Sequence, residues 1–144
     1  MSPQMAGKYM RIVGIFSILV AVLFALAGVN DFTGVNDLFF RLASSGNEGV
    51  AGLNTLEAKM AMAIAGGVFG GLMAMYVFIS APGVEQGNEL IRKGSIYTFL
   101  TWFIIDSGAS LASGNAPNVI PNVIFLVTYL APLLLVKRET ARHT

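Results

Sequence analysis

Apolar residues fill four long runs of the chain, at positions 12–29, 60–80, 96–112 and 119–136. A helix crosses the ~30 Å hydrocarbon core of a membrane with about 20 predominantly apolar residues, and each run is close to that length. The first run contains no charged residue, whereas the third is the least apolar because it contains Asp106 and several hydroxyl side chains. The pattern predicts four membrane-spanning helices.

The composition strengthens this prediction. Of the 144 residues, 55% are hydrophobic and only 12% are charged, and the mean hydropathy is +0.69. A small soluble domain buries only about two thirds of the surface that its unfolded chain exposes, so a large apolar excess remains for lipid to cover. We therefore expect residues 1–144 to form a single integral membrane domain of the all-α class, a four-transmembrane-helix bundle. The net charge of +1 also argues against nucleic-acid binding.

Residues that hold metals or perform catalysis are scarce. The chain has no cysteine, and its one histidine, His143, is next to the C-terminus. Disulfides, thiolate metal sites, cysteine nucleophiles and metals held by internal imidazoles are thereby excluded. The apolar runs contain no pair of carboxylates and no glycine-rich phosphate loop of the kind that follows a strand. We predict no metal site, no cofactor and no catalytic residue.

The distribution of lysine and arginine predicts the orientation, because cytoplasmic loops of membrane proteins are enriched in these residues. Arg41 and Lys59 lie on one side of the four runs. The other side, with both termini and the 81–95 connection, has seven cationic residues, which are Lys8, Arg11, Arg92, Lys93, Lys137, Arg138 and Arg142. Both termini are therefore expected in the cytoplasm.

An alternative interpretation of the first run stays open. Lys8 and Arg11 precede an apolar stretch that ends near Ala25 and Ala27, as in a secretory signal peptide. The apolar run is longer than the ~7–15 residues of a usual signal peptide, which favours a membrane span.

The connection between the first two runs contains apolar residues at helical spacing. Phe32, Val35, Phe39 and Leu42 recur on one face. The spacing predicts a short helix that lies along the outer membrane interface or caps the bundle. A partly ordered loop is the alternative.

Small residues dominate the second run and form two adjacent ridges along one helix. One ridge consists of Ala63, Gly67 and Gly71, and the other of Gly66, Gly70 and Ala74. Small residues at this spacing let helix backbones approach closely in lipid. We expect these ridges to pack against other helices of the chain or, alternatively, against a second copy.

Aromatic residues near the predicted cytoplasmic boundary fit an interfacial belt, in which tyrosine and tryptophan are enriched. Tyr9, Tyr76 and Tyr97 are expected there. Trp102 lies ~14 Å from Lys93 along a helix, which is too deep for the belt.

Asp106 is the one acidic residue within a predicted span, and such a residue is by default a candidate for a functional site. Counted from Lys93 at 1.5 Å per residue, it lies ~20 Å into the membrane, in the outer half. Polar residues at the same level, together with Trp102 one turn deeper, complete a candidate binding site, whose members are Asp106, Trp102, Ser107, Ser110, Asn118, Asn122 and Lys59.

Two interpretations of this candidate site remain open. In the structural one, Asp106 is fixed by asparagine and serine side chains, or paired with Lys59, and joins the third span to its neighbours. In the functional one, Asp106 lines an outward-facing pocket that binds a cation, a proton or a polar head group.

Residues 55–136 resemble small uncharacterised bacterial four-helix membrane proteins that are broadly DoxX-like. The most specific pieces are the W-F-x-x-D-S motif at positions 102–107 and the N-V-x-x-N-V motif at 118–123. The resemblance implies a four-helix fold in the bacterial inner membrane and implies no reaction.

Three functions are consistent with these features. The first is a non-enzymatic binding or accessory subunit, whose partners are membrane lipid, a partner membrane protein or a second copy, and a small apolar or cationic ligand. The second is a small proton- or cation-coupled transporter that uses Asp106. The third is a membrane enzyme acting on a lipid or isoprenoid, with Asp106 as general acid or base.

Overall fold

A computed structural model describes residues 1–137, and within them it contains helices and no strand, which confirms the all-α class. The long helices are α1 (Pro3–Leu26), α3 (Leu56–Met75), α5 (Glu89–Ala112) and α6 (Val119–Leu135). α3 continues without a break through the π-helical turn η2 (Tyr76–Ser80) into α4 (Ala81–Glu85). The shorter elements are α2 (Val35–Ala43) and the 3-10 turns η1 (Gly49–Leu53) and η3 (Ala116–Asn118). Arg138, Arg142 and His143 lie outside the described residues.

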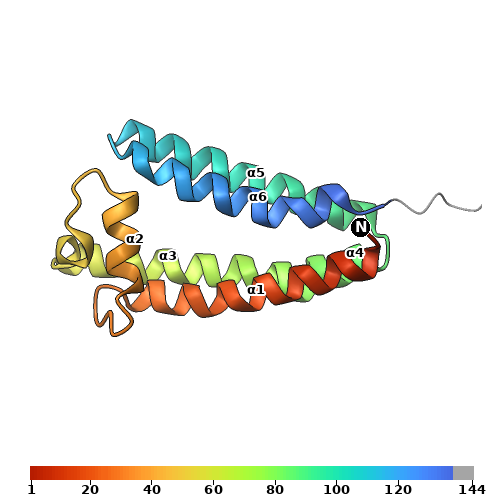
Figure 1. The fold of residues 1–144 in the computed structure, drawn as a ribbon, viewed down its shortest axis with the longest axis horizontal. Coiled ribbons are helices and arrows are strands. Elements are labelled where there is room, and N and C mark those ends of the chain that lie inside the picture. Colours follow the sequence, from red (N-terminus) through yellow and green to blue (C-terminus); the bar gives the residue numbers. More distant parts are fainter. Residues whose placement is uncertain (138–144) are drawn as a thin grey trace, which may run out of the picture.

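The long helices form two antiparallel pairs (Figure 1). α1 packs along α3, and α5 packs along α6. The pairs meet at the end that holds the N-terminus, where η2 and α4 contact both α1 and α5. We call this the closed end. At the opposite, open end, α2 lies across the ends of the long helices.

The core sits toward the closed end and is built around buried aromatic rings. Tyr76 and Phe99 are fully buried, and their rings meet edge to face with centroids 5.2 Å apart. The Tyr76 hydroxyl donates to the carbonyl of Tyr129 at 2.8 Å. The Tyr9 hydroxyl donates at 3.4 Å to the Thr128 carbonyl, which has lost its helical partner because Pro132 has no N–H. The expected place of Tyr76 in an interfacial belt is therefore wrong, because its ring fills the core.

One of the two small-residue ridges packs against α1. A Cβ atom placed on Gly66 would lie 2.5 Å from the backbone nitrogen of Ala25, so only glycine allows this approach. Gly70 lies next, opposite Ala21. By contrast, Gly67 and Gly71 have no neighbouring atom within 4 Å of such a position. Within the described residues, the ridge of Ala63, Gly67 and Gly71 is therefore exposed and does not pack.

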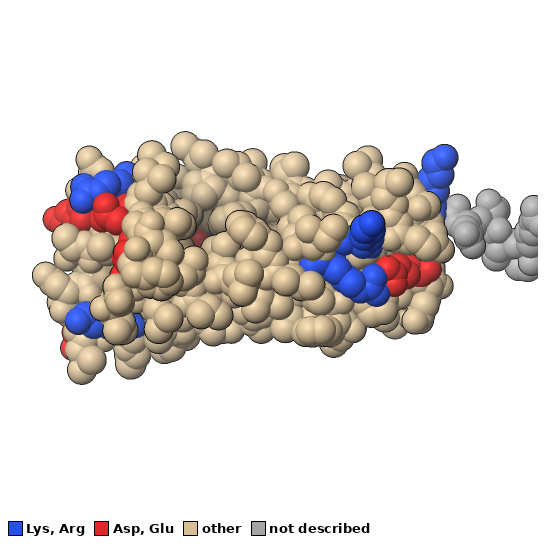
Figure 2. Space-filling view, turned by 60° about the horizontal axis from the view of Figure 1, so that its bottom comes forward, with Lys and Arg blue, Asp and Glu red and all other residues tan. Residues whose placement is uncertain are grey.

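The surface between the two ends is apolar. Three helical stretches are long and apolar enough to cross a membrane, namely Pro3–Leu26, Leu56–Glu85 and Ala116–Leu135. α5 is of similar length, but it is not among the three stretches. Asp106 and the hydroxyl side chains of α5 lower the mean hydropathy of this helix. Figure 2 shows charged residues gathered at the two ends and an uncharged surface between them. These features indicate an integral membrane protein.

α2 connects the helix pairs at the open end. The side chain of Asn36, which is buried, donates to the carbonyl of Leu23 at 3.0 Å and so fastens α2 to the end of α1. Phe24 of α1 packs against both Phe39 and Phe40. Past α2, the backbone N–H of Ser45 donates to the side chain of Asn115 in the α5–α6 turn at 2.8 Å. The predicted helix in this connection is thus present, with Phe39 toward the bundle and Val35 and Leu42 exposed.

Candidate functional site

The polar residues of α5 and α6 meet in a cluster centred on one carboxylate oxygen. Asp106 Oδ1 accepts hydrogen bonds from the side-chain amides of Asn122 at 2.7 Å and Asn118 at 3.0 Å. The Ser110 hydroxyl donates to the same oxygen at 3.4 Å. The amides also reach the serines, Asn118 to Ser110 at 2.9 Å and Asn122 to Ser107 at 3.2 Å. We call Asp106, Ser107, Ser110, Asn118 and Asn122 the acid–amide cluster.

Helical spacing explains why the cluster forms. Asp106 and Ser110 are four residues apart on α5, so they lie on one face. Asn118 and Asn122 have the same spacing at the start of α6, after the short α5–α6 turn, in which Gly114 adopts a positive φ of 79°. Antiparallel packing of the two helices then brings the two faces together. Five of the predicted site residues are therefore in direct contact, as their helical positions suggested.

The second oxygen of Asp106 is not part of this network. None of the hydrogen bonds within residues 1–137 involves Oδ2. Every fully buried side-chain oxygen or nitrogen in this part of the chain has a partner, so Oδ2 is not fully buried. The acid–amide cluster thus holds the carboxylate through Oδ1, and Oδ2 is left for a further hydrogen-bond donor.

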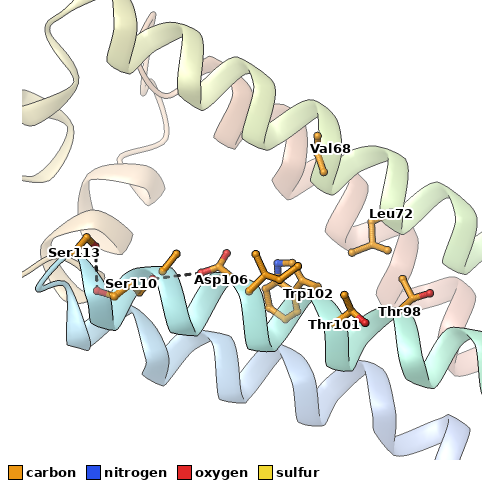
Figure 3. A pocket seen from close by; sticks show the side chains of 10 residues that line it. Val68, Leu72, Thr98, Thr101, Trp102, Asp106, Ser110 and Ser113 are labelled. Carbon is orange, nitrogen blue, oxygen red and sulfur yellow. Dashed lines mark hydrogen bonds between the residues drawn. The ribbon is translucent and has the colours of Figure 1, made fainter.

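A cavity of about 730 Å³ lies beside the cluster, between α3 and α5. Figure 3 shows Val68 and Leu72 of α3 across the cavity from Trp102 and Asp106 of α5. Its remaining lining residues come from α5 and from the residue that caps its end, and are Thr98, Thr101, Ile105, Ala109, Ser110 and Ser113. Of the ten residues that line the cavity, Asp106 alone is charged.

The cavity opens on the side of the bundle. Val68 and Ile105, which line it from opposite helices, are 68% and 66% exposed, so its walls continue into the outer apolar surface. Figure 2 shows a hollow in the uncharged face of the molecule. The cavity therefore has a lateral opening between the helices, and an opening toward the outer aqueous side stays a prediction.

Lys59 is the predicted site residue that the structure does not bring to the cluster. It is exposed in the first turn of α3, and its side chain lies against Gly28 at the end of α1. Lys59 therefore faces α1, the partner of α3 within its own helix pair, and the cavity separates α3 from α5. The ion pairs within residues 1–137 join Arg11 with Glu85, Arg41 with Asp37, and Glu89 with its helical neighbours, and none includes Asp106.

Several lining residues were missed by sequence reasoning. Thr98, Ile105, Ala109 and Ser113 lie on the same face of α5 as Trp102, at intervals of three or four residues. That spacing was readable in the sequence once Trp102 and Asp106 were assigned to one face. Val68 and Leu72 gave no comparable signal, because an apolar residue on a membrane helix is ordinarily lipid-facing.

Charged residues outside the cavity form ion pairs and hydrogen bonds at the two ends of the bundle. At the closed end the guanidinium of Arg92, which is buried, donates to Glu89 and to the carbonyl of Leu133 at 2.8 Å. In α2, Arg41 donates to Asp37 at 2.7 Å, and the backbone N–H of Val50 donates to the same carboxylate at 3.0 Å. Both hydrogen bonds, that of Arg41 most strongly, hold the pKa of Asp37 below its ordinary value.

Comparison of the chain with protein-family models, with curated proteins and with solved structures finds no match. The resemblance of residues 55–136 to DoxX-like proteins therefore stays a prediction. Within residues 1–137, no three histidine or acidic side chains come together in a way that could hold a metal ion.

Proposed function

We propose that the protein is a four-span membrane protein of the bacterial inner membrane, with α5 as the fourth span and both termini in the cytoplasm. α5 lies along α6, one of the stretches long and apolar enough to cross. Its acid and two of its serines face α6 or the cavity, whereas Ile104 and Leu111 are exposed to the surroundings. The excess of lysine and arginine on the side of the termini supports the orientation, and it puts α2 at the outer surface.

We further propose that the protein binds a small molecule in the cavity between α3 and α5 and does not transform it. The proposal rests on the difference between the two carboxylate oxygens of Asp106. A carboxylate kept only to join two helices has no reason to leave an oxygen beside an open cavity, since an unsatisfied polar atom in lipid is costly. Here Oδ1 accepts three hydrogen bonds and Oδ2 accepts none within the described residues. A cavity of about 730 Å³ is within the range of small-molecule sites.

Catalysis has less support than binding. General acid–base chemistry or nucleophilic attack requires a second reactive group within reach of the first. Of the ten lining residues, Asp106 is the one acid, and none is a histidine, lysine or tyrosine.

Transport has less support as well, because a transported ion or molecule needs a path to both sides of the membrane. One turn beyond the lining residue Leu72 toward the closed end is the fully buried Tyr76, whose ring packs against Phe99 and Tyr129. These packed rings fill the bundle at the inner end of the cavity.

Native mass spectrometry of the protein released from lipid nanodiscs tests the binding function. Val68→Trp places a bulky ring at the cavity wall, whereas Ile64→Trp makes the same change one turn away on α3, outside the cavity. We expect a bound species of defined mass on the wild type and on Ile64→Trp, and its loss from Val68→Trp. Equal occupancy in all three proteins, or no bound species on the wild type, would overturn the proposal. A larger protein partner in the spectrum would instead identify an accessory subunit.

A further inference from the structure

We propose that the ligand is an amphiphilic monocation, a protonated amine on an elongated apolar body, with the amine at Asp106 Oδ2. This inference rests on the proposed binding function and specifies the chemical class that the cavity accepts.

The charge of the site has no counterpart within the described residues. Asp106 receives neutral donors only, from two asparagines and a serine, and Lys59 lies on the other helix pair. A carboxylate away from water is strongly disfavoured unless a positive charge is near. An ammonium group beside Oδ2 supplies both the charge and the N–H donor that this oxygen lacks.

Trp102 gives a second reason for a cation. It lies four residues before Asp106 on α5, about 6 Å along the axis on the same face. Figure 3 shows both side chains on the cavity side of the helix. The face of an indole ring attracts ammonium groups, most strongly where water is excluded. A ligand with its amine at Asp106 is therefore within reach of the ring.

The other hydroxyls of the cavity are largely taken up by the protein itself. Thr98 Oγ1 donates to the Gly94 carbonyl at 2.9 Å, and Ser113 Oγ donates to the Ser110 carbonyl at 3.0 Å. Ser110 Oγ donates to Asp106. The rest of the lining is mostly apolar and includes Leu72 of α3 and Ile105 of α5. The site therefore matches a molecule with one polar, positive group and an otherwise apolar surface.

The shape of the cavity and its opening favour an elongated molecule that arrives through the membrane. Its α5 wall extends from Thr98 to Ser113, about 22 Å along the helix axis. The walls at Val68 and Ile105 continue into the apolar exterior. Amphiphilic cations concentrate in bilayers, so a lateral opening gives them direct access.

The chain contains one tryptophan, which makes the test direct. Because Trp102 lines the cavity, its fluorescence reports occupancy without a label. The protein in lipid vesicles, which add no tryptophan of their own, is titrated with 4-phenylbutylamine and with its neutral analogue 4-phenylbutan-1-ol. The two probes share the apolar body and differ in charge. Asp106→Asn removes the carboxylate, and Glu57→Gln is the control that makes the same charge change at an exposed residue outside the cavity.

We expect the amine to bind the wild type and Glu57→Gln roughly tenfold more tightly than the alcohol, the scale of one charge-assisted hydrogen bond. In Asp106→Asn the two probes should bind alike, with the affinity for the alcohol unchanged. Equal binding of both probes to the wild type would overturn the cationic class and leave the binding function standing. If neither probe changes the emission of Trp102, the cationic class fails, and the native mass spectrum of the wild type decides the binding function separately.

Discussion

Gly66→Ala is predicted to destabilise the protein relative to Gly67→Ala, although the two glycines are adjacent in α3. A Cβ atom on Gly66 would lie 2.5 Å from the nitrogen and 2.6 Å from the Cα of Ala25, well inside van der Waals contact. Those atoms are backbone, so α1 and α3 must move apart. On Gly67 the same atom would meet nothing within 4 Å.

The magnitude follows from two opposing terms. Replacing glycine by alanine within a helix stabilises it by up to ~1 kcal/mol, and this gain applies to both variants. Overpacking costs about 1–3 kcal/mol and applies to Gly66→Ala alone. The difference between the variants therefore isolates the packing cost, and it corresponds to a gap in Tm of at least about 2 °C for a chain of this size.

Thermal unfolding in one detergent, followed by circular dichroism at 222 nm, measures this gap. Gly70→Ala is a further control, because its Cβ would lie at an ordinary 3.6 Å from the Cβ of Ala21. We expect Gly67→Ala and Gly70→Ala to melt at or above the wild-type Tm and Gly66→Ala to melt below both. Equal Tm values for Gly66→Ala and Gly67→Ala would refute the packing of α1 on this ridge.

Three further predictions address the topology, the acid–amide cluster and α2. A reporter active only in the periplasm should be silent when fused after Thr144 and active when inserted in the 45–52 loop; the reverse pattern would contradict the orientation. Asn122→Ala should lower the free energy of unfolding by about 1 kcal/mol, because its buried amide donates to Asp106 and Ser107; an unchanged Tm would argue against this packing of α5 on α6. Since the folded-state pKa of Asp37 is lowered, its ionised form stabilises the protein above the ordinary pKa of 3.8, and this contribution disappears as the pH falls through the lowered value. Asp37→Asn should therefore weaken the loss of Tm on acidification below about pH 4, and an identical pH profile would count against the Arg41 contact.

Hydropathy predicted where the long helices are but not where they begin and end. The second apolar run ends at Ser80, yet the helix continues through the π turn to Glu85, and α5 begins at Glu89, well before the third run. The capping side chain of Asn88, which accepts from the N–H of Ile91, sets that start. The length of an apolar run reflects how much of a helix contacts lipid, whereas capping side chains and turns determine where the helix begins and ends.

Helical spacing predicted the contacts within one helix pair and failed between pairs. Asp106, Asn118 and Asn122 were identified because sequence-adjacent helices with a short turn must lie side by side. Lys59 was assigned to the same site from its level in the membrane, and level says nothing about which neighbour a side chain faces. For the same reason the sequence did not separate the packed ridge of Gly66 from the exposed ridge of Gly67.

Asp106→Asn tests the central claim that Asp106 binds a ligand and does not merely join two helices. Asparagine keeps the size of the side chain and a hydrogen-bonding oxygen for the amides of Asn118 and Asn122, while the negative charge is lost. Native mass spectrometry from nanodiscs, with the Tm measured on the same preparation, gives both readouts. We predict a Tm within a few degrees of the wild type and loss of the bound species, with Asp106→Leu lowering the Tm as well. A folded Asp106→Asn protein that retains its ligand at wild-type occupancy would contradict the account.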